Sequence, residues 1–98
     1  MDRDLAVALL NEHAPEIRAR GVERLALIGS TARGEAGPDS DVDVLADIEP
    51  GRVFTLFDLV ALNEFLAEIL DRRVDVVLAR GLKTRMEQSV QAERVEVF

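Results

Sequence analysis

The chain contains no cysteine, tryptophan or tyrosine among its 98 residues. The absence of cysteine excludes a disulfide scaffold, a thiolate zinc site and a cysteine nucleophile. Long apolar runs are also missing, because the longest one is the six residues from Leu5 to Leu10. That run is too short to span a membrane, and the residues around it do not have the pattern of a secretory signal. We therefore expect a cytoplasmic protein without a membrane partner.

Basic residues are scarce, since nineteen acids outnumber twelve bases and the net charge is −7. Residues 35–71 hold ten of these acids and only one base, Arg52. A nucleic-acid-binding surface needs a basic footprint, so we expect no direct contact with nucleic acid. The acidic middle suits metal cations or a basic protein surface, although acids can also serve only to keep a small protein dispersed.

Hydrophobic residues make up 48% of the chain and charged residues 32%, which is typical of one globular domain, here residues 1–98. Periodicity, capping residues and glycines predict the following elements: helices over 2–13, 15–20, 55–71 and 83–93, strands over 22–28, 41–48, 73–78 and 95–98, and a structured loop over 29–40. Strands that are separated by helices indicate an α/β or α+β fold, with helices packed on a sheet.

The predicted helix over 55–71 is apolar around more than half of its circumference. Only Glu64, Glu68 and Asp71 form a solid polar stripe along it. One small sheet does not need so wide an apolar face, so we expect part of this face to contact a partner.

Two carboxylates carry the clearest chemical signal. Asp41 and Asp43 are two residues apart on a predicted strand, so they project from one face with Cα atoms about 6.5 Å apart. A divalent cation would relieve their mutual repulsion, and Mg²⁺ prefers such oxygen ligands. Asp75, the only charge in a mostly apolar strand, is the candidate third ligand, although it could instead pair with Arg72 or Arg73.

Three carboxylates on neighbouring strands can hold two metal ions roughly 3.5–4 Å apart, an arrangement used in phosphoryl and nucleotidyl transfer. One of the carboxylates could also accept the proton of the attacking hydroxyl group. We therefore interpret Asp41, Asp43 and Asp75 as metal ligands and catalytic residues.

Gly29 and Ser30 follow directly on a predicted buried strand, where a glycine permits close approach of a ligand to the backbone. The hydroxyl of Ser30 and backbone N–H groups could bind the oxygens of a phosphate group, and Arg33 could neutralise its charge. In the alternative interpretation, Ser30 caps the following turn and Arg33 pairs with Glu35 or Asp39 on the surface.

Two other motifs fail on inspection. The spacing from Gly29 to Gly34 begins like a P-loop, but a Glu-Ala pair stands where Lys-Ser or Lys-Thr is required. The alternating acids that start at Asp39 begin like an EF-hand, but Val44 stands at the position of the required glycine.

The pattern of Gly29-Ser30, ten residues and then Asp41-Val42-Asp43 resembles the signature of minimal nucleotidyltransferases (MNT) of the DNA polymerase β superfamily. It looks most similar to MNT antitoxins that are encoded beside HEPN-domain RNase toxins. The resemblance extends over nearly the whole chain and includes the segment 74–77 and the C-terminal residues 96–98.

The resemblance implies a mixed sheet in which Asp41, Asp43 and Asp75 form a Mg²⁺-binding triad, with ATP phosphates on Gly29 and Ser30. It also implies transfer of AMP to a tyrosine of the cognate HEPN toxin and assembly with that toxin. Two alternatives stay open: a non-catalytic antitoxin that neutralises the toxin by binding it, and nucleotidylation of a small molecule or an RNA end.

Overall fold

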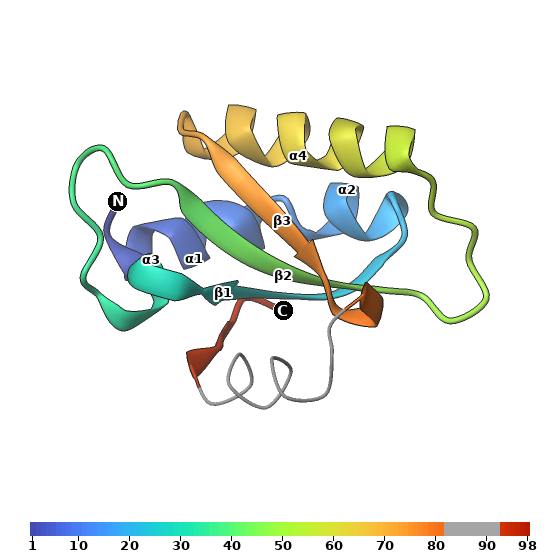
Figure 1. The fold of residues 1–98 in the computed structure, drawn as a ribbon, viewed down its shortest axis with the longest axis horizontal. Coiled ribbons are helices and arrows are strands. Elements are labelled where there is room, and N and C mark those ends of the chain that lie inside the picture. Colours follow the sequence, from blue (N-terminus) through green and yellow to red (C-terminus); the bar gives the residue numbers. More distant parts are fainter. Residues whose placement is uncertain (82–92) are drawn as a thin grey trace.

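The computed structural model describes residues 1–81 and 93–98 of the chain. Its sheet has the strand order β3-β2-β1-β4, formed by β1 (Val22–Ile28), β2 (Val42–Ile48), β3 (Val74–Leu78) and β4 (Val95–Glu96). β1 is antiparallel to both β2 and β4, whereas β2 and β3 are parallel. The predicted small mixed sheet with flanking helices is therefore confirmed (Figure 1).

The helices are α1 (Arg3–Glu12), α2 (Ala14–Ala19), α3 (Gly29–Arg33) and α4 (Leu56–Leu70), followed by the short 3-10 helix η1 (Ala79–Gly81). Buried side chains of α1, α2 and α4 form one cluster with the alternate positions of the strands that face them. These three helices thus cover one face of the sheet (Figure 1). A smaller cluster, built on Ala26, Ile28 and Leu45, lies apart from the main core.

Local chemistry explains where the long helices begin. The side chain of Asp2 accepts a hydrogen bond from the N–H of Leu5 and caps α1. Thr55 and Asp58 form the predicted capping box of α4, in which each side chain accepts a hydrogen bond from the backbone N–H of the other residue. In the described part of the chain, no helix is both long enough and apolar enough to cross a membrane.

Three predictions of local structure differ from the structure. The predicted loop over 29–40 begins with the helical turn α3, which Gly34 ends in the left-handed region at φ 74°. The second strand begins at Val42 rather than Asp41, and the C-terminal strand spans only Val95–Glu96. The predicted helix over 83–93 lies almost entirely outside the described residues.

Candidate active site

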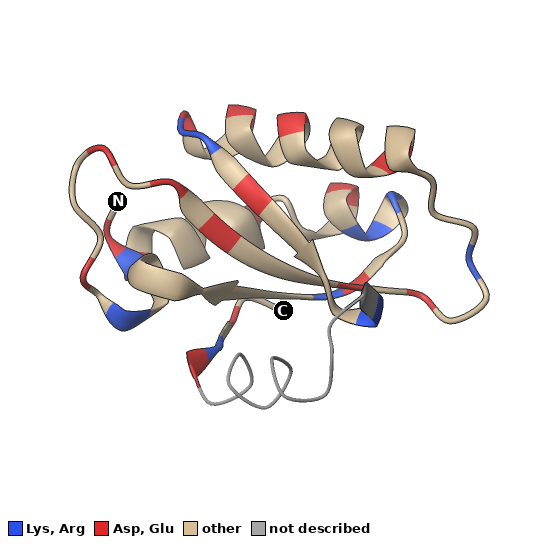
Figure 2. Cartoon of the chain, viewed as in Figure 1, with Lys and Arg blue, Asp and Glu red and all other residues tan. Residues whose placement is uncertain are grey.

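The strand pairings bring two of the predicted carboxylates together. Asp43, in β2, is the register partner of Asp75 on the parallel strand β3. On its other side Asp43 pairs with Ile28, the last residue of β1 before the Gly-Ser turn. Acidic bands accordingly lie side by side on β2 and β3 (Figure 2). Asp41 lies one residue before β2, at the same end of the sheet.

Asp43 lies directly against Gly29. A Cβ atom placed on Gly29 would lie 2.6 Å from Oδ2 of Asp43, closer than real Cβ contacts. Gly29 also has a φ of +70°, which side-chain-bearing residues rarely adopt. Both facts require glycine at this position, so the Gly-Ser turn and the Asp43 carboxylate form one compact unit.

The environment of Asp43 disfavours its charge. Burial raises the pKa of Asp43, and the negative charges of Asp75 and Asp41 raise that pKa further. Among the described residues no Lys, Arg or His forms an ion pair with Asp43 or Asp75. Within the part of the chain that the structure describes, the carboxylates of Asp43 and Asp75 therefore repel each other without an ion-paired protein cation.

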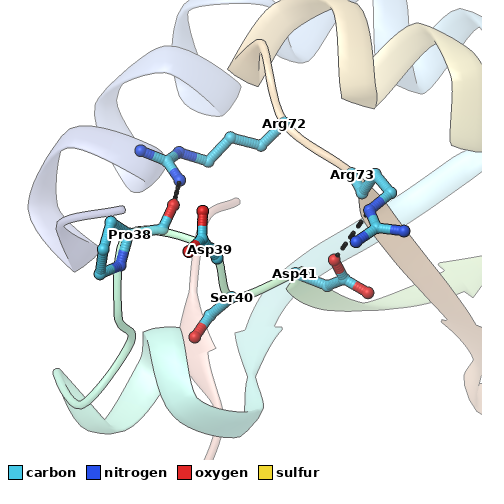
Figure 3. A pocket seen from close by; sticks show the side chains of 6 residues that line it. All are labelled: Pro38, Asp39, Ser40, Asp41, Arg72 and Arg73. Atoms are coloured by element: carbon cyan, nitrogen blue, oxygen red, sulfur yellow. Dashed lines mark hydrogen bonds and ion pairs between the residues drawn. The ribbon is translucent and has the colours of Figure 1, made fainter.

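Asp75 differs from its predicted setting. Its strand is buried at Val74 and Val76, but the side chain of Asp75 is exposed. The alternative pairing with Arg72 or Arg73 is wrong, because those arginines bind other groups. Arg73 lies 3.3 Å from Asp41, and Arg72 donates a hydrogen bond to the carbonyl of Pro38 (Figure 3).

The donor set fits Mg²⁺, because carboxylate oxygens are its preferred protein ligands and the repulsion around Asp43 is the kind that a divalent cation relieves. The described residues do not form a ready-made metal cage, since no group of three acidic or histidine side chains converges on one point. Asp41 meets Arg73 through Oδ1, so metal binding by all three carboxylates would use the other oxygen of Asp41 or a rotation of its side chain.

Ser30 lies within the first turn of α3, immediately after Gly29. The alternative in which Ser30 caps this helix is wrong, because Ile28 is the N-cap residue and no side chain caps the helix. Arg33 forms ion pairs of 3.1 Å with both Glu35 and Glu93. The hydrogen bond to Glu35 raises the pKa of Arg33, so its guanidinium stays charged. The surface pairing with Glu35 is thus confirmed, and phosphate binding by Arg33 stays a prediction.

Two hollows border the carboxylates. One, of about 350 Å³, is lined by Pro38, Asp39, Ser40, Asp41, Arg72 and Arg73 (Figure 3). The other, of about 330 Å³, lies between α4 and β3 and is lined by Leu59, Val60, Asn63, Glu64, Asp75 and Val76. Each hollow therefore borders the candidate site, because Asp41 lines the first and Asp75 lines the second.

Sequence reasoning missed Asn63. Its Oδ1 accepts a hydrogen bond of 3.1 Å from the N–H of Val76, next to Asp75. This contact ties α4 to the outer edge of β3 and fixes the strand segment that carries Asp75. An amide side chain that follows directly on the apolar run 59–62 is a signal that could have identified Asn63.

The chain is similar to known nucleotidyltransferases. Residues 10–97 match the family model described as the nucleotidyltransferase domain. The protein adenylyltransferase MntA of Thermococcus cleftensis is 40% identical over 91 residues, which cover 92% of this chain and 90% of the relative.

Solved structures give the same result. One described as a candidate minimal nucleotidyltransferase is 38% identical, with a TM-score of 0.75 over 97% of this chain and 95% of the other. An MNT antitoxin in complex with tri-AMPylated HEPN toxin of Shewanella oneidensis, at 19% identity, shares the fold with a TM-score of 0.67 over 98% and 71%. The resemblance inferred from the Gly-Ser and Asp-x-Asp motifs is confirmed, and the chain belongs to the nucleotidyltransferase domain family.

Proposed function

We propose that this chain is a Mg²⁺-dependent protein adenylyltransferase of the cytoplasm, acting as the antitoxin of a HEPN-domain RNase toxin. It transfers AMP from ATP to a tyrosine hydroxyl of that toxin. The similarity to a protein adenylyltransferase over 92% of the chain supports this proposal. The fold shared with an MNT antitoxin bound to AMPylated HEPN toxin supports the choice of partner.

One observation carries the catalytic part of the proposal. Asp43 stands between Gly29 and Asp75, with a raised pKa and without a cationic protein partner among the described residues. In this arrangement the turn at Gly29, proposed to bind phosphates, lies beside the carboxylates of Asp43 and Asp75. A bound divalent cation would relieve the repulsion between these two carboxylates.

The residues have distinct roles in the proposed reaction. Asp41, Asp43 and Asp75 would hold Mg²⁺, which when bound supplies positive charge that offsets the charge on the triphosphate and the leaving group. The turn at Gly29 and Ser30 orients the phosphates through backbone N–H groups and the serine hydroxyl. Arg33 would add a phosphate contact once it leaves Glu35 and Glu93, which engage it in this structure.

The chemical step conserves atoms and charge. The acceptor oxygen forms a bond to the α-phosphorus, and the bond from that phosphorus to the bridging oxygen breaks, which releases pyrophosphate. Asp75, exposed beside Asp43, takes the proton of the acceptor hydroxyl.

The test is incubation of the chain with ATP, Mg²⁺ and the HEPN-domain protein encoded beside it. Intact-mass spectrometry should show added AMP with wild type and none with Asp41→Asn. Asp47→Asn is the matched control, because Asp47 lies on the same strand and face as Asp43 but away from Gly29. Absence of an adduct with wild type, or equal addition by Asp41→Asn, would refute the proposal.

A second function is favoured by a specific observation. Phe57, on α4, is 87% exposed in a segment of the chain rich in acids, which suits a chain that clamps a basic toxin without catalysis. The double variant Asp41→Asn, Asp43→Asn separates the two functions. Full neutralisation of the toxin by this variant would establish binding as sufficient, whereas loss of protection with retained binding would establish catalysis as necessary.

A further inference from the structure

Four large apolar side chains are exposed close together near the start of α4. The exposed fractions are 81% for Val53, 73% for Leu56, 87% for Phe57 and 50% for Val60. Leu56 and Phe57 lie four and three residues before Val60, so these three side chains are neighbours on the helix surface. We call these four residues the apolar ridge. A cluster of exposed apolar side chains is typical of an interaction surface, whereas single exposed apolar side chains are common on any protein.

The apolar ridge leads into the candidate active site. Val60 belongs to the ridge and also lines the hollow of about 330 Å³ between α4 and β3. Asp75 lines the opposite side of the same hollow. α4 and β3 diverge from the turn that joins them (Figure 1). The side chain of Asp75 itself projects from the other face of β3, because Val74 and Val76 pack into the core beneath α4. β3 is an edge strand, so a protein seated on the ridge would reach Asp75 around that exposed edge.

The charges around the ridge are mostly acidic, with Arg52, directly before Val53, as a basic exception. Residues 53–71 include four acids, Asp58, Glu64, Glu68 and Asp71, and no base. Acidic bands follow α4 along its length (Figure 2). An apolar ridge with an acidic border is complementary to a protein surface that presents apolar side chains among lysines and arginines.

The outer edge of β3 is less suited to pairing with another strand. At Val76 the N–H that points away from β2 already donates to Asn63. This hydrogen bond removes one edge donor from pairing with an added strand, which favours recognition of a partner through the exposed side chains of α4.

We propose that the apolar ridge and the adjoining hollow are the docking site of the acceptor protein, which contributes a basic and apolar surface. A partner that docks there and extends around the edge of β3 would bring its acceptor hydroxyl to Asp75. The location of the hydroxyl rests on the proposed function, but the docking itself is measurable without ATP.

The test compares two substitutions that each add aspartate to the first turn of a helix, where the helix dipole favours negative charge. Phe57→Asp lies on the ridge, and Leu5→Asp, at a 50% exposed position of α1, is the matched control. The probe is the HEPN-domain protein encoded beside this chain. We expect its Kd, measured by biolayer interferometry without ATP, to rise at least tenfold for Phe57→Asp and to change less than twofold for Leu5→Asp.

Three further measurements make the assignment specific. The affinity of wild type should fall as NaCl is raised from 50 to 300 mM, and Glu64→Lys should weaken binding and reduce this salt dependence. In AMP transfer, Phe57→Asp should raise KM for the acceptor protein, while calorimetry should show unchanged affinity for Mg²⁺ and ATP. Circular dichroism should show that both aspartate variants keep the wild-type helix content.

Each outcome is decisive for the docking site. Wild-type binding that Phe57→Asp leaves intact, or no wild-type binding at all, would overturn it. A dimer of the free chain that Phe57→Asp dissociates would also overturn it, because the ridge would then bind a second copy. If wild type binds through the ridge but transfers no AMP, the docking site stands and the proposed function fails.

Discussion

At the scale of single residues, Asp43 is the position where the demands of folding and of the proposed function conflict. It lies between the backbone of Gly29 and the carboxylate of Asp75, and burial and neighbouring charges raise its pKa. A metal ion binds the ionised carboxylate of Asp43. Without the metal, the fold disfavours this ionised form relative to the protonated one. Strain of this kind is typical of sites that complete their charge balance only when a ligand binds.

The raised pKa makes a prediction about pH. A carboxyl group whose pKa is higher in the folded than in the unfolded state reduces stability as pH rises through and above its unfolded value, about 3.8. Asp43→Asn should therefore stabilise the metal-free protein at pH 7 by on the order of 0.5 kcal/mol, which allows for solvent screening of this half-exposed group. The gain should disappear below pH 3.8. Denaturant unfolding in EDTA across this pH range measures it.

The Asp43→Asn result has an internal control in Asp47→Asn, on the same strand and face. No gain at pH 7 for Asp43→Asn relative to Asp47→Asn would show that Asp43 is not electrostatically strained in the fold.

A second prediction concerns Gly29. Gly29→Ala should cost about 1–2 kcal/mol for an alanine held at positive φ and should also displace the carboxylate of Asp43, which would lie 2.6 Å from the new Cβ. Gly34→Ala is the matched control, since Gly34 has a φ of +74° but a Cβ added there would meet no atom within 4 Å. We expect similar losses of stability in both variants, measured by thermal unfolding, but weakened Mg²⁺–ATP binding by calorimetry only in Gly29→Ala. Equal Mg²⁺–ATP affinities of Gly29→Ala and Gly34→Ala would show that Gly29 is not part of the nucleotide-binding site.

At the scale of elements, α4 supports the candidate site in two ways. Its apolar side packs into the main core through Leu62, Leu66 and Leu70, and Asn63 fixes the strand beside Asp75. Its first turn depends on the capping box between Thr55 and Asp58. Hydrogen bonds that the backbone N–H of Thr55 and, secondly, its hydroxyl donate to the carboxylate lower the pKa of Asp58.

Loss of the cap should therefore be visible in global stability. Thr55→Ala removes the acceptor for the N–H of Asp58 and should lower the free energy of unfolding by about 1 kcal/mol. The lowered pKa of Asp58 adds stability above the unfolded value of about 3.8 that is lost as pH falls through the lower folded pKa. Thr55→Ser keeps the hydroxyl and should retain most of the stability in urea unfolding. An equal loss for serine would show that the methyl group, and not the cap, matters.

Elements with a local cause were predictable from the sequence. The caps at Asp2 and Thr55 and the alternation of β2 depend on neighbouring residues, and all of them appear in the structure. The strand order and the parallel register of Asp43 with Asp75 did not follow from spacing, because pairing between distant segments depends on how all the layers pack. Asp75 was a candidate ligand because it is the only charge in a mostly apolar strand, but its pairing with Asp43 could not be derived from that observation.

The errors have the same origin. Arg73 pairs with Asp41 rather than Asp75, and the side chain of Asp75 is exposed although its strand is partly buried. Sequence neighbours alone cannot show which face of an edge strand is covered. The turn after Gly29 was predicted as loop because glycines flank it, yet Ser30 to Arg33 contain nothing that prevents a helical turn.

At the scale of the whole molecule, charge is distributed unevenly over a small fold. The net charge is −7, and residues 35–71, with ten acids against one base, carry a charge of −9 that the rest of the chain partly offsets. This segment includes Asp41, Asp43 and the exposed acids of α4. One face of the sheet carries the helices, and the candidate carboxylates lie away from that core. Repulsion among these acids opposes the compact state, so a cation that binds the folded chain should stabilise it.

Magnesium should accordingly raise the melting temperature of the wild-type chain without any nucleotide. At ten times Kd, ligand binding adds about 1.4 kcal/mol, which for a domain of this size corresponds to about 5–10 °C. Asp41→Asn and Asp75→Asn should each reduce the shift, whereas Asp47→Asn should preserve it, as measured by scanning calorimetry with MgCl₂. General screening of the net charge would give the same rise with NaCl of equal ionic strength and in all three variants. A specific site requires a rise that depends on Mg²⁺ and on the two acids that flank Asp43.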